Sequence, residues 1–183
     1  MDLSTHLLDS YRSRFAYYRQ LGQAAMAQLS FPELQRDDAA RSNSIAVIVK
    51  HLAGNMRSRW TDFLHTDGEK PWRQRDTEFV DDFRDRDALQ AAWDEGWRVL
   101  ETALAELRPE LLGEVVYIRN EGHTVIEALN RQLAHYSYHV GQIVLLAKQI
   151  RGTDWRSLSI PRGESERYNV ERFGRDAEDG STE

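Results

Sequence analysis

The sequence contains no cysteine. A protein without cysteine has no disulfide framework, no thiolate ligand for a metal and no cysteine nucleophile. Any thiol that takes part in the chemistry of this protein must therefore be supplied by another molecule.

The sequence also lacks a basic excess and long apolar runs. Its 24 Lys and Arg residues are outnumbered by 30 Asp and Glu residues, the net charge is −6, and the basic residues are scattered among acidic ones. Nucleic-acid binding requires clustered positive charge, so we expect no nucleic-acid partner. The longest apolar runs, residues 45–49 and 143–147, are far shorter than the ~20 residues that cross a membrane. With no secretory signal at the N-terminus, we expect a cytoplasmic protein that does not cross a membrane.

Apolar residues recur every three or four positions in long segments, which is typical of amphipathic helices. Thr124 and Glu127 have the spacing of a capping box, Asp87 and Gln90 have the same spacing, and Gly152 is suited to end a helix. The sequence predicts four helices, over residues 4–29, 44–64, 87–108 and 124–152.

Four long helices and little strand predict an all-α protein, a four-helix bundle with long connections between its helices. We expect one domain over residues 1–170 and a disordered tail over residues 171–183. Residues 115–118 are β-branched and lie between glycines, so they predict an extended connector or a strand fragment. Residues 65–84 are expected to form a long loop, which in a compact domain is often functional or laid across an end of the core. The tract at residues 70–75 has the basic and aromatic composition of an anion site, but the acidic residues that follow it favour a solvated loop. The pair Trp93 and Trp97 is expected in the core or at an interface.

The histidines are the strongest chemical signal. His135 and His139 lie four residues apart on one face of the last predicted helix, and His51 shares a polar stripe with Asn55 on the second. A buried polar stripe is costly unless something binds to it. Three imidazoles could hold one metal ion, or they could be hydrogen-bonded core or surface residues. The other three histidines lie near helix ends or in loops and are not expected to be ligands: His6, His65 and His123.

Three segments carry a pattern that is also found elsewhere: residues 44–52 around His51, residues 123–130, and the H-x-x-x-H-x-x-Q motif within residues 135–143. Together they resemble the DinB-like superfamily. The tract at residues 72–76 and the segment at residues 157–163 are similar to a branch of uncharacterised bacterial DinB-related proteins.

This resemblance implies a four-helix bundle with a three-histidine site for a divalent metal, whose ligands correspond to His51, His135 and His139. The characterised relatives are enzymes that use low-molecular-weight thiols such as bacillithiol or mycothiol, including S-transferases and a maleylpyruvate isomerase. The pattern does not select among zinc, nickel, iron and manganese, because imidazole-rich sites accept several first-row ions.

Three neutral imidazoles leave an ion with its full charge and an open position, which is typical of catalytic sites. Such an ion lowers the pKa of a bound water or thiol, so the site suits either hydrolysis or thiol transfer. The leading hypothesis is a metal-dependent transferase that acts on a small-molecule substrate and activates a low-molecular-weight thiol. A metal-water hydrolase and a non-enzymatic stress-response or interaction module, with a structural metal or none, are the alternatives, and a homodimer fits the content of Trp.

Other residues have both a functional and a structural interpretation. Asn55, Arg131 and Glu127 are the catalytic candidates, although hydrogen bonds at the rim explain the first two equally well and the capping box explains Glu127. Gln142 is suited to hydrogen-bond an imidazole of the site. Arg162, between a proline and a glycine, is placed like a substrate or partner contact on a rigid turn.

Overall fold

The computed structural model describes residues 2–37 and 43–174. These residues are mostly helical, with short 3-10 helices and one two-stranded sheet, which confirms the all-α class. The helices are α1 (Leu3–Met26), α2 (Phe31–Leu34), α3 (Ile45–Trp60), η1 (Arg75–Phe79), α4 (Arg86–Glu106), η2 (Pro109–Gly113), α5 (Val125–Arg151), η3 (Gly152–Asp154) and α6 (Ser165–Phe173), and the strands are β1 (Val115–Ile118) and β2 (Glu121–Thr124).

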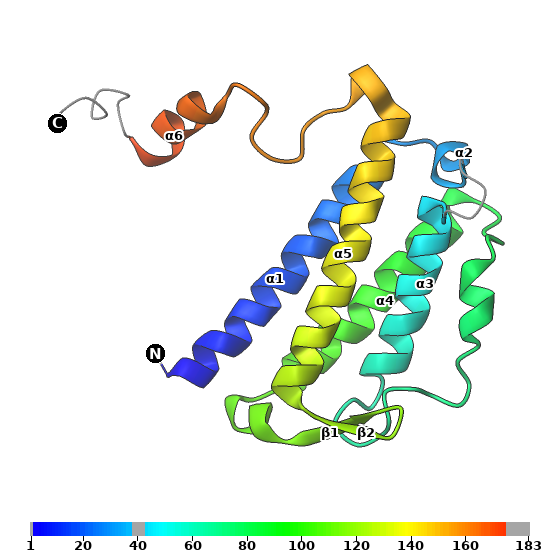
Figure 1. The fold of residues 1–183 in the computed structure, drawn as a ribbon, viewed down its shortest axis with the longest axis vertical. Helices are drawn as coiled ribbons and strands as arrows, with labels where there is room; N and C mark the ends of the chain where they lie inside the picture. Colours follow the sequence, from blue (N-terminus) through cyan, green and yellow to red (C-terminus); the bar gives the residue numbers. More distant parts are fainter. Residues whose placement is uncertain (1, 38–42, 175–183) are drawn as a thin grey trace.

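The four long helices α1, α3, α4 and α5 run side by side (Figure 1). α1 packs against α5, α3 packs against α4, and α3 also contacts α5. Their shared core is aromatic: Trp93 and Trp97 are each 1% exposed with ring centroids 5.4 Å apart, and Trp60 and Tyr136 are buried beside them. Burial of one such side chain is worth about 1.5–3 kcal/mol. The prediction that Trp93 and Trp97 lie in the core or at an interface is confirmed for the core.

Each of the four predicted long helices is present, and each ends one to four residues earlier than predicted. α3 stops at Trp60 because Thr61 is extended and Asp62 has a positive φ of 48°. α1 stops at Met26, although Leu29 continues its apolar spacing, because Leu29 packs into the core from the following turn.

The helix caps are partly as predicted. The capping box of Thr124 and Glu127 is formed at the start of α5, and the last predicted helix ends at Gly152. The predicted box of Asp87 and Gln90 is wrong. α4 begins one residue earlier and is capped by Asp85, whose carboxylate accepts a hydrogen bond from the amide of Ala88 at 2.8 Å.

The predicted strand fragment at residues 115–118 is strand β1, which pairs with β2 in an antiparallel hairpin. Arg119 and Asn120 form its two-residue turn with positive φ angles of 56° and 61°, as two-residue hairpin turns require. The carboxylate of Asp67 accepts hydrogen bonds from both of their amides, at 2.9 and 2.7 Å. This contact attaches the hairpin to the segment that follows α3.

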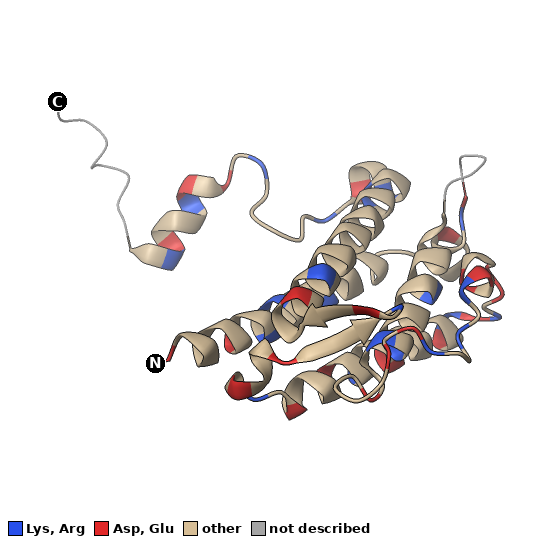
Figure 2. Ribbon diagram, turned by 60° about the horizontal axis from the view of Figure 1, so that its bottom comes forward, with Lys and Arg blue, Asp and Glu red and all other residues tan. Residues whose placement is uncertain are grey.

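The segment between α3 and α4, residues 61–85, is not the solvated loop that the sequence suggested. Its acidic and basic residues are interspersed (Figure 2), but η1 packs on α3 and two of the charged side chains point inward. Arg73 and Glu78 are 3% and 7% exposed and form an ion pair at 2.8 Å. Mutual neutralisation permits this burial, which neither charge could sustain alone.

The chain beyond α5 leaves the four long helices (Figure 1). α6 was not expected, has no buried residue and reaches into the segment predicted as a tail. Residues 175–183 of that predicted tail lie outside the described residues. No helix among residues 2–37 and 43–174 is both long and apolar enough to span a membrane.

Candidate metal centre

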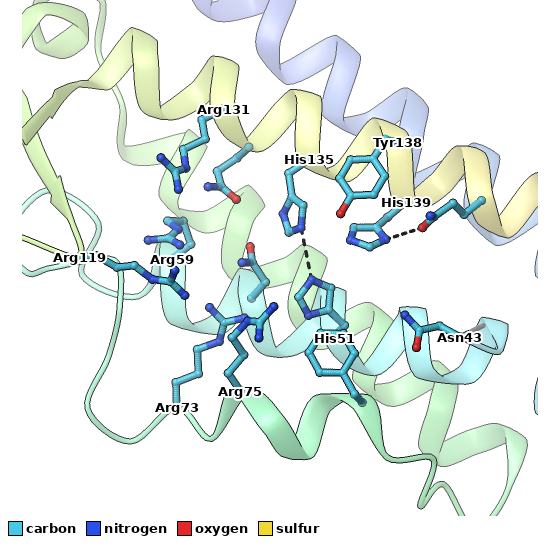
Figure 3. Close-up of a pocket in the computed structure, with 14 residues that line it drawn as sticks. Asn43, His51, Arg59, Arg73, Arg75, Arg119, Arg131, His135, Tyr138 and His139 are labelled. Carbon is cyan, nitrogen blue, oxygen red and sulfur yellow. Dashed lines mark hydrogen bonds between the residues drawn. The ribbon is translucent and has the colours of Figure 1, made fainter. Parts of the chain in front are cut away.

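Three histidines from two helices meet at the contact between α3 and α5. His51 comes from α3, and His135 and His139 come from successive turns of α5. Each offers a ring nitrogen, and these nitrogens all lie within 4.8 Å of one another. The Nε2 atoms of His51 and His135 are 3.3 Å apart (Figure 3). His51 and His139 are buried and His135 is half-buried.

The contact with Glu78 fixes which ring nitrogen of His51 faces the other histidines. Its Nδ1 lies 2.9 Å from Oε2 of Glu78, whose side chain is 7% exposed. A carboxylate accepts hydrogen bonds, so Nδ1 carries a hydrogen, and Nε2 is the ring nitrogen that faces His135. Burial by itself raises the pKa of Glu78, but hydrogen bonds from Arg73 and His51 and the charges of these residues outweigh burial and hold the pKa below its usual value.

His139 is oriented in the same way. Its Nδ1 lies 2.8 Å from Oε1 of Gln142, one turn further along α5, so the predicted contact between Gln142 and an imidazole is confirmed. The Nε2 atom of His139 is buried and has no hydrogen-bond partner among the described residues. A bound ion or an ordered water would satisfy this buried nitrogen.

The imidazoles of α5 are neutral at physiological pH. Burial, together with the charge of neighbouring imidazoles, lowers the pKa of His135 to about 3 and that of His139 to about 4. For His135 the guanidinium groups of Arg59 and Arg73 act in the same direction. Neutral imidazole is the form that binds a metal ion.

The donor set fits a first-row divalent ion. A tetrahedral ion with metal–nitrogen distances of ~2.1 Å keeps its ligands about 3.4 Å apart. The Nε2 atoms of His51 and His135 are 3.3 Å apart, and all three donor nitrogens lie within 4.8 Å of one another. The hydrogen bond from His51 to a carboxylate is the usual support for a histidine ligand. Three converging imidazoles and an unpartnered nitrogen make this cluster a candidate metal centre.

The cluster lies at one end of a pocket of about 460 Å³, a size that suits a small molecule. Asn55 and Arg131, two of the three catalytic candidates, line this pocket. Glu127 does not line it, because its carboxylate accepts hydrogen bonds from the amide and hydroxyl of Thr124 at the start of α5. Tyr138 packs against His139 with ring centroids 4.1 Å apart and the rings tilted by 32°, and its hydroxyl points into the pocket (Figure 3).

A family model described as "Protein of unknown function (DUF1572)" matches residues 2–164. The chain belongs to this family. The match includes the three histidines of the cluster and ends directly before α6. No curated protein and no solved structure matches the chain.

Within the DUF1572 match, two residues of the site were missed by sequence reasoning. Glu78 and Arg73 were assigned to a solvated loop, yet they form the support behind His51. A signal was present in Gly54 of α3, because a Cβ atom at this position would overlap the carboxylate of Glu78. A glycine in the middle of a helix costs about 1 kcal/mol relative to alanine, so it usually marks a close approach.

Asn55 is held in the pocket wall by a buried chain of hydrogen bonds. Trp60 Nε1 donates to the hydroxyl of Tyr136 at 2.9 Å, and this hydroxyl donates to Oδ1 of Asn55 at 3.0 Å. Tyr136 is fully buried, and burial raises its pKa. This chain of hydrogen bonds engages the oxygen of the Asn55 amide and so fixes the orientation of its side chain.

The remaining sequence candidates lie apart from the cluster. The other histidines are not among the residues whose ring nitrogens converge: His6, His65 and His123. Arg162 is exposed and is not among the residues that line the pocket. The structure therefore brings together His51, His135, His139, Asn55 and Arg131 from the predicted set.

Proposed function

We propose that this protein is a divalent-metal-dependent transferase that uses a low-molecular-weight thiol as its co-substrate. His51, His135 and His139 would hold the ion, with zinc, nickel, iron and manganese all compatible with three imidazoles. The observation that carries the proposal is the convergence of three imidazoles, one of which has a buried Nε2 atom without a partner among the described residues.

The proposal includes a DinB-type four-helix bundle formed by α1, α3, α4 and α5. The contacts of α1 with α5, of α3 with α4, and of α3 with α5 support it. The long connection between α3 and α4 agrees with the uneven connections that the sequence predicts. Low-molecular-weight thiols are kept reduced in the cytosol, so the expected cytoplasmic location agrees with this chemistry.

The residues of the site have separable roles. An ion held by the three imidazoles would lower the pKa of a thiol or a water that it contacts. Glu78 and Gln142 fix the ring orientation of His51 and His139. Asn55 lines the pocket at a fixed orientation, because Tyr136 engages its amide oxygen, and is placed to position a polar substrate group.

Thiol transfer is favoured over hydrolysis by the composition of the pocket wall. A metal-water hydrolase uses a general base near the attacking water, most often a carboxylate or a histidine. No aspartate or glutamate of the described chain lines the pocket, and Glu78 is engaged by His51 and Arg73. A thiol depends less than water on a general base for its deprotonation, because its unperturbed pKa of about 8.5 is already close to neutral.

Elemental analysis of tag-free protein tests the metal site. We expect about one equivalent of a transition metal in the wild type, its loss in His135→Ala, and its retention in His65→Ala, which removes an imidazole outside the cluster. A wild type that takes up no metal even after reconstitution would overturn the proposal.

Titration of the Co²⁺-substituted protein with small thiols tests the co-substrate. We expect a thiol to change the visible absorption spectrum of the cobalt, because a sulfur ligand adds a charge-transfer band. If cobalt binds and no thiol from a panel of common low-molecular-weight thiols changes the spectrum, the transferase assignment fails while the metal site stands.

A further inference from the structure

The pocket beside the histidines concentrates positive charge. Five arginines line it, and no acidic residue of the described chain does. Figure 3 shows Arg59, Arg119 and Arg131 at the end of the pocket away from His139, and Arg73 and Arg75 between them and His51. The chain as a whole carries a net charge of −6, so this local excess runs against the overall composition.

Internal carboxylates account for only part of this charge. Glu78 takes two hydrogen bonds from Arg73, each at 2.8 Å. Glu69 lies 3.3 Å from both Arg73 and Arg119. Two carboxylates, those of Glu69 and Glu78, thus form all the ion pairs of the five pocket arginines among the described residues. Arg131 forms no ion pair with any residue that the structure describes.

Among the five arginines, Arg59 most clearly lacks hydrogen-bond acceptors. Its side chain is 5% exposed, and its nearest carboxylate oxygen, on Glu69, is 3.9 Å away. Its Nε and Nη1 atoms are buried and have no hydrogen-bond partner in residues 2–37 and 43–174. A Cβ atom at Gly68 would lie 2.6 Å from Nη1, so this segment packs directly on the guanidinium and holds it in place. A fixed, buried guanidinium with two unsatisfied N–H groups and a single long ion pair is costly unless a further acceptor binds nearby.

We infer that the arginine end of the pocket binds an oxyanion, a carboxylate or a phosphate, carried by the small molecule that reacts at the histidines. Arg59, Arg119 and Arg131 are the residues that would bind it. Guanidinium groups match carboxylate and phosphate oxygens through paired hydrogen bonds. The inference rests on the proposed function for the role of the molecule as a substrate, whereas anion binding itself can be measured without metal.

Two neutral amides lie between the charged end and the histidines. Asn55 and Gln132 line the pocket, and Oε1 of Gln132 is buried without a partner among the described residues. A molecule that spans the pocket would therefore place its anion on the arginines, a hydrogen-bond donor near Gln132 and its reacting atom near the imidazoles. Neutral electrophiles without an anionic group would lose the charged contact and bind more weakly.

Calorimetric titration of the metal-free protein with inorganic phosphate and, separately, with succinate tests this inference. We expect at least one of them to bind at a single site, and the better ligand identifies the anion as a phosphate or a carboxylate. Arg131→Gln and Arg119→Gln should each weaken binding at least tenfold. The control Arg98→Gln removes an exposed arginine of α4 that pairs with Glu95 and should leave binding unchanged.

Arg59→Lys tests the hydrogen-bonding geometry of the guanidinium separately from its charge. It keeps the charge but loses the fork of N–H donors, so weaker binding without loss of helical circular dichroism would assign a specific contact to Arg59. If neither anion binds the wild type, or if Arg131→Gln, Arg119→Gln and Arg98→Gln all weaken binding equally, the inference is overturned.

The metal content of Arg131→Gln separates this inference from the proposed function. We expect this variant to retain the wild-type metal equivalent and its spectral response to a thiol. Loss of anion binding with metal retained supports a separate anion-binding end. A wild type that binds metal and thiol but no anion would overturn the inference alone, and a wild type that binds an anion but no metal would overturn the proposed function alone.

Discussion

Glu78 accepts a hydrogen bond from Nδ1 of His51 at 2.9 Å, although 27 residues separate the two positions. The same carboxylate receives two hydrogen bonds from Arg73. The connection between α3 and α4 therefore takes part in the histidine cluster from behind, without supplying any of its three imidazoles.

The first prediction follows from this contact. Glu78→Gln keeps the volume of the side chain but removes the charge that supports His51 and balances Arg73. Loss of such a support typically weakens metal binding ~10- to 100-fold, and we expect a decrease in this range. Competition with a chromophoric chelator measures it. Glu95→Gln on the exposed surface of α4 is the control, and equal affinities of the two variants would contradict the role of Glu78.

The second prediction concerns Gly54. Alanine normally stabilises the middle of a helix by about 1 kcal/mol relative to glycine, but at this position its Cβ would overlap the carboxylate of Glu78. We expect Gly54→Ala to displace Glu78 and to weaken metal binding. Gly141→Ala on α5 is the matched control, since nothing lies within 4 Å of its Cβ position.

Chemical denaturation completes this comparison. Gly141→Ala should raise the free energy of unfolding by ~0.5–1 kcal/mol, and Gly54→Ala should not. If both variants gain stability equally and Gly54→Ala binds metal as the wild type does, the close approach of Glu78 to α3 is wrong.

The third prediction concerns the hydroxyl of Tyr136. Tyr136→Phe leaves Nε1 of Trp60 and Oδ1 of Asn55 without this partner in a buried environment. Each unsatisfied buried group costs about 1–3 kcal/mol, so we expect a loss of about 2–4 kcal/mol in the free energy of unfolding. Tyr117→Phe changes an exposed tyrosine of β1 and should have little effect. Urea denaturation of both variants decides the matter.

The fourth prediction concerns pH. The Asp67 carboxyl is partly desolvated, which raises its pKa, but hydrogen bonds from the amides of Asn120, Glu69 and Arg119 lower the pKa below its usual value by a larger amount. Its contribution to stability is thus complete above the unfolded-state pKa of ~3.9 and is lost as the pH falls through the lower folded-state pKa.

Because solvent screens this partly exposed carboxylate, Asp67→Asn should lower the free energy of unfolding by about 1 kcal/mol near neutral pH. The difference from the wild type should stay constant down to about pH 4 and shrink below it. Asp154→Asn, at an exposed position after α5, serves as the control. A difference that grows as the pH falls would contradict the assignment.

The sequence was sufficient for the long helices, because apolar spacing and caps are local. The capping box of Thr124 and Glu127 shows this directly. It was also sufficient for the pairing of His135 with His139, since four residues on one helix fix their relation. The meeting of His51 with them is a property of helix packing, which sequence spacing alone cannot establish.

The connection between α3 and α4 was misjudged for a physical reason. Its alternating charges are typical of a solvated loop, and nothing local marks Arg73 and Glu78 as exceptions. Their burial depends on one another and on His51, which lies on a different element. The N-cap of α4 was predicted at the wrong residue because Asp85 and Asp87 are equally suitable N-cap residues. In the structure the carboxylate of Asp85 accepts the capping hydrogen bond from the amide of Ala88.

The elements that place the imidazoles, α3 and α5, are not the elements that supply most of the charge around them. The two helices fix where the imidazoles stand, and changes there also disturb the aromatic core. Glu78 and three of the five pocket arginines, Arg73, Arg75 and Arg119, lie outside those two helices. Substitutions in the connection and in the hairpin turn therefore change the charge beside the imidazoles without altering the two helices that place them.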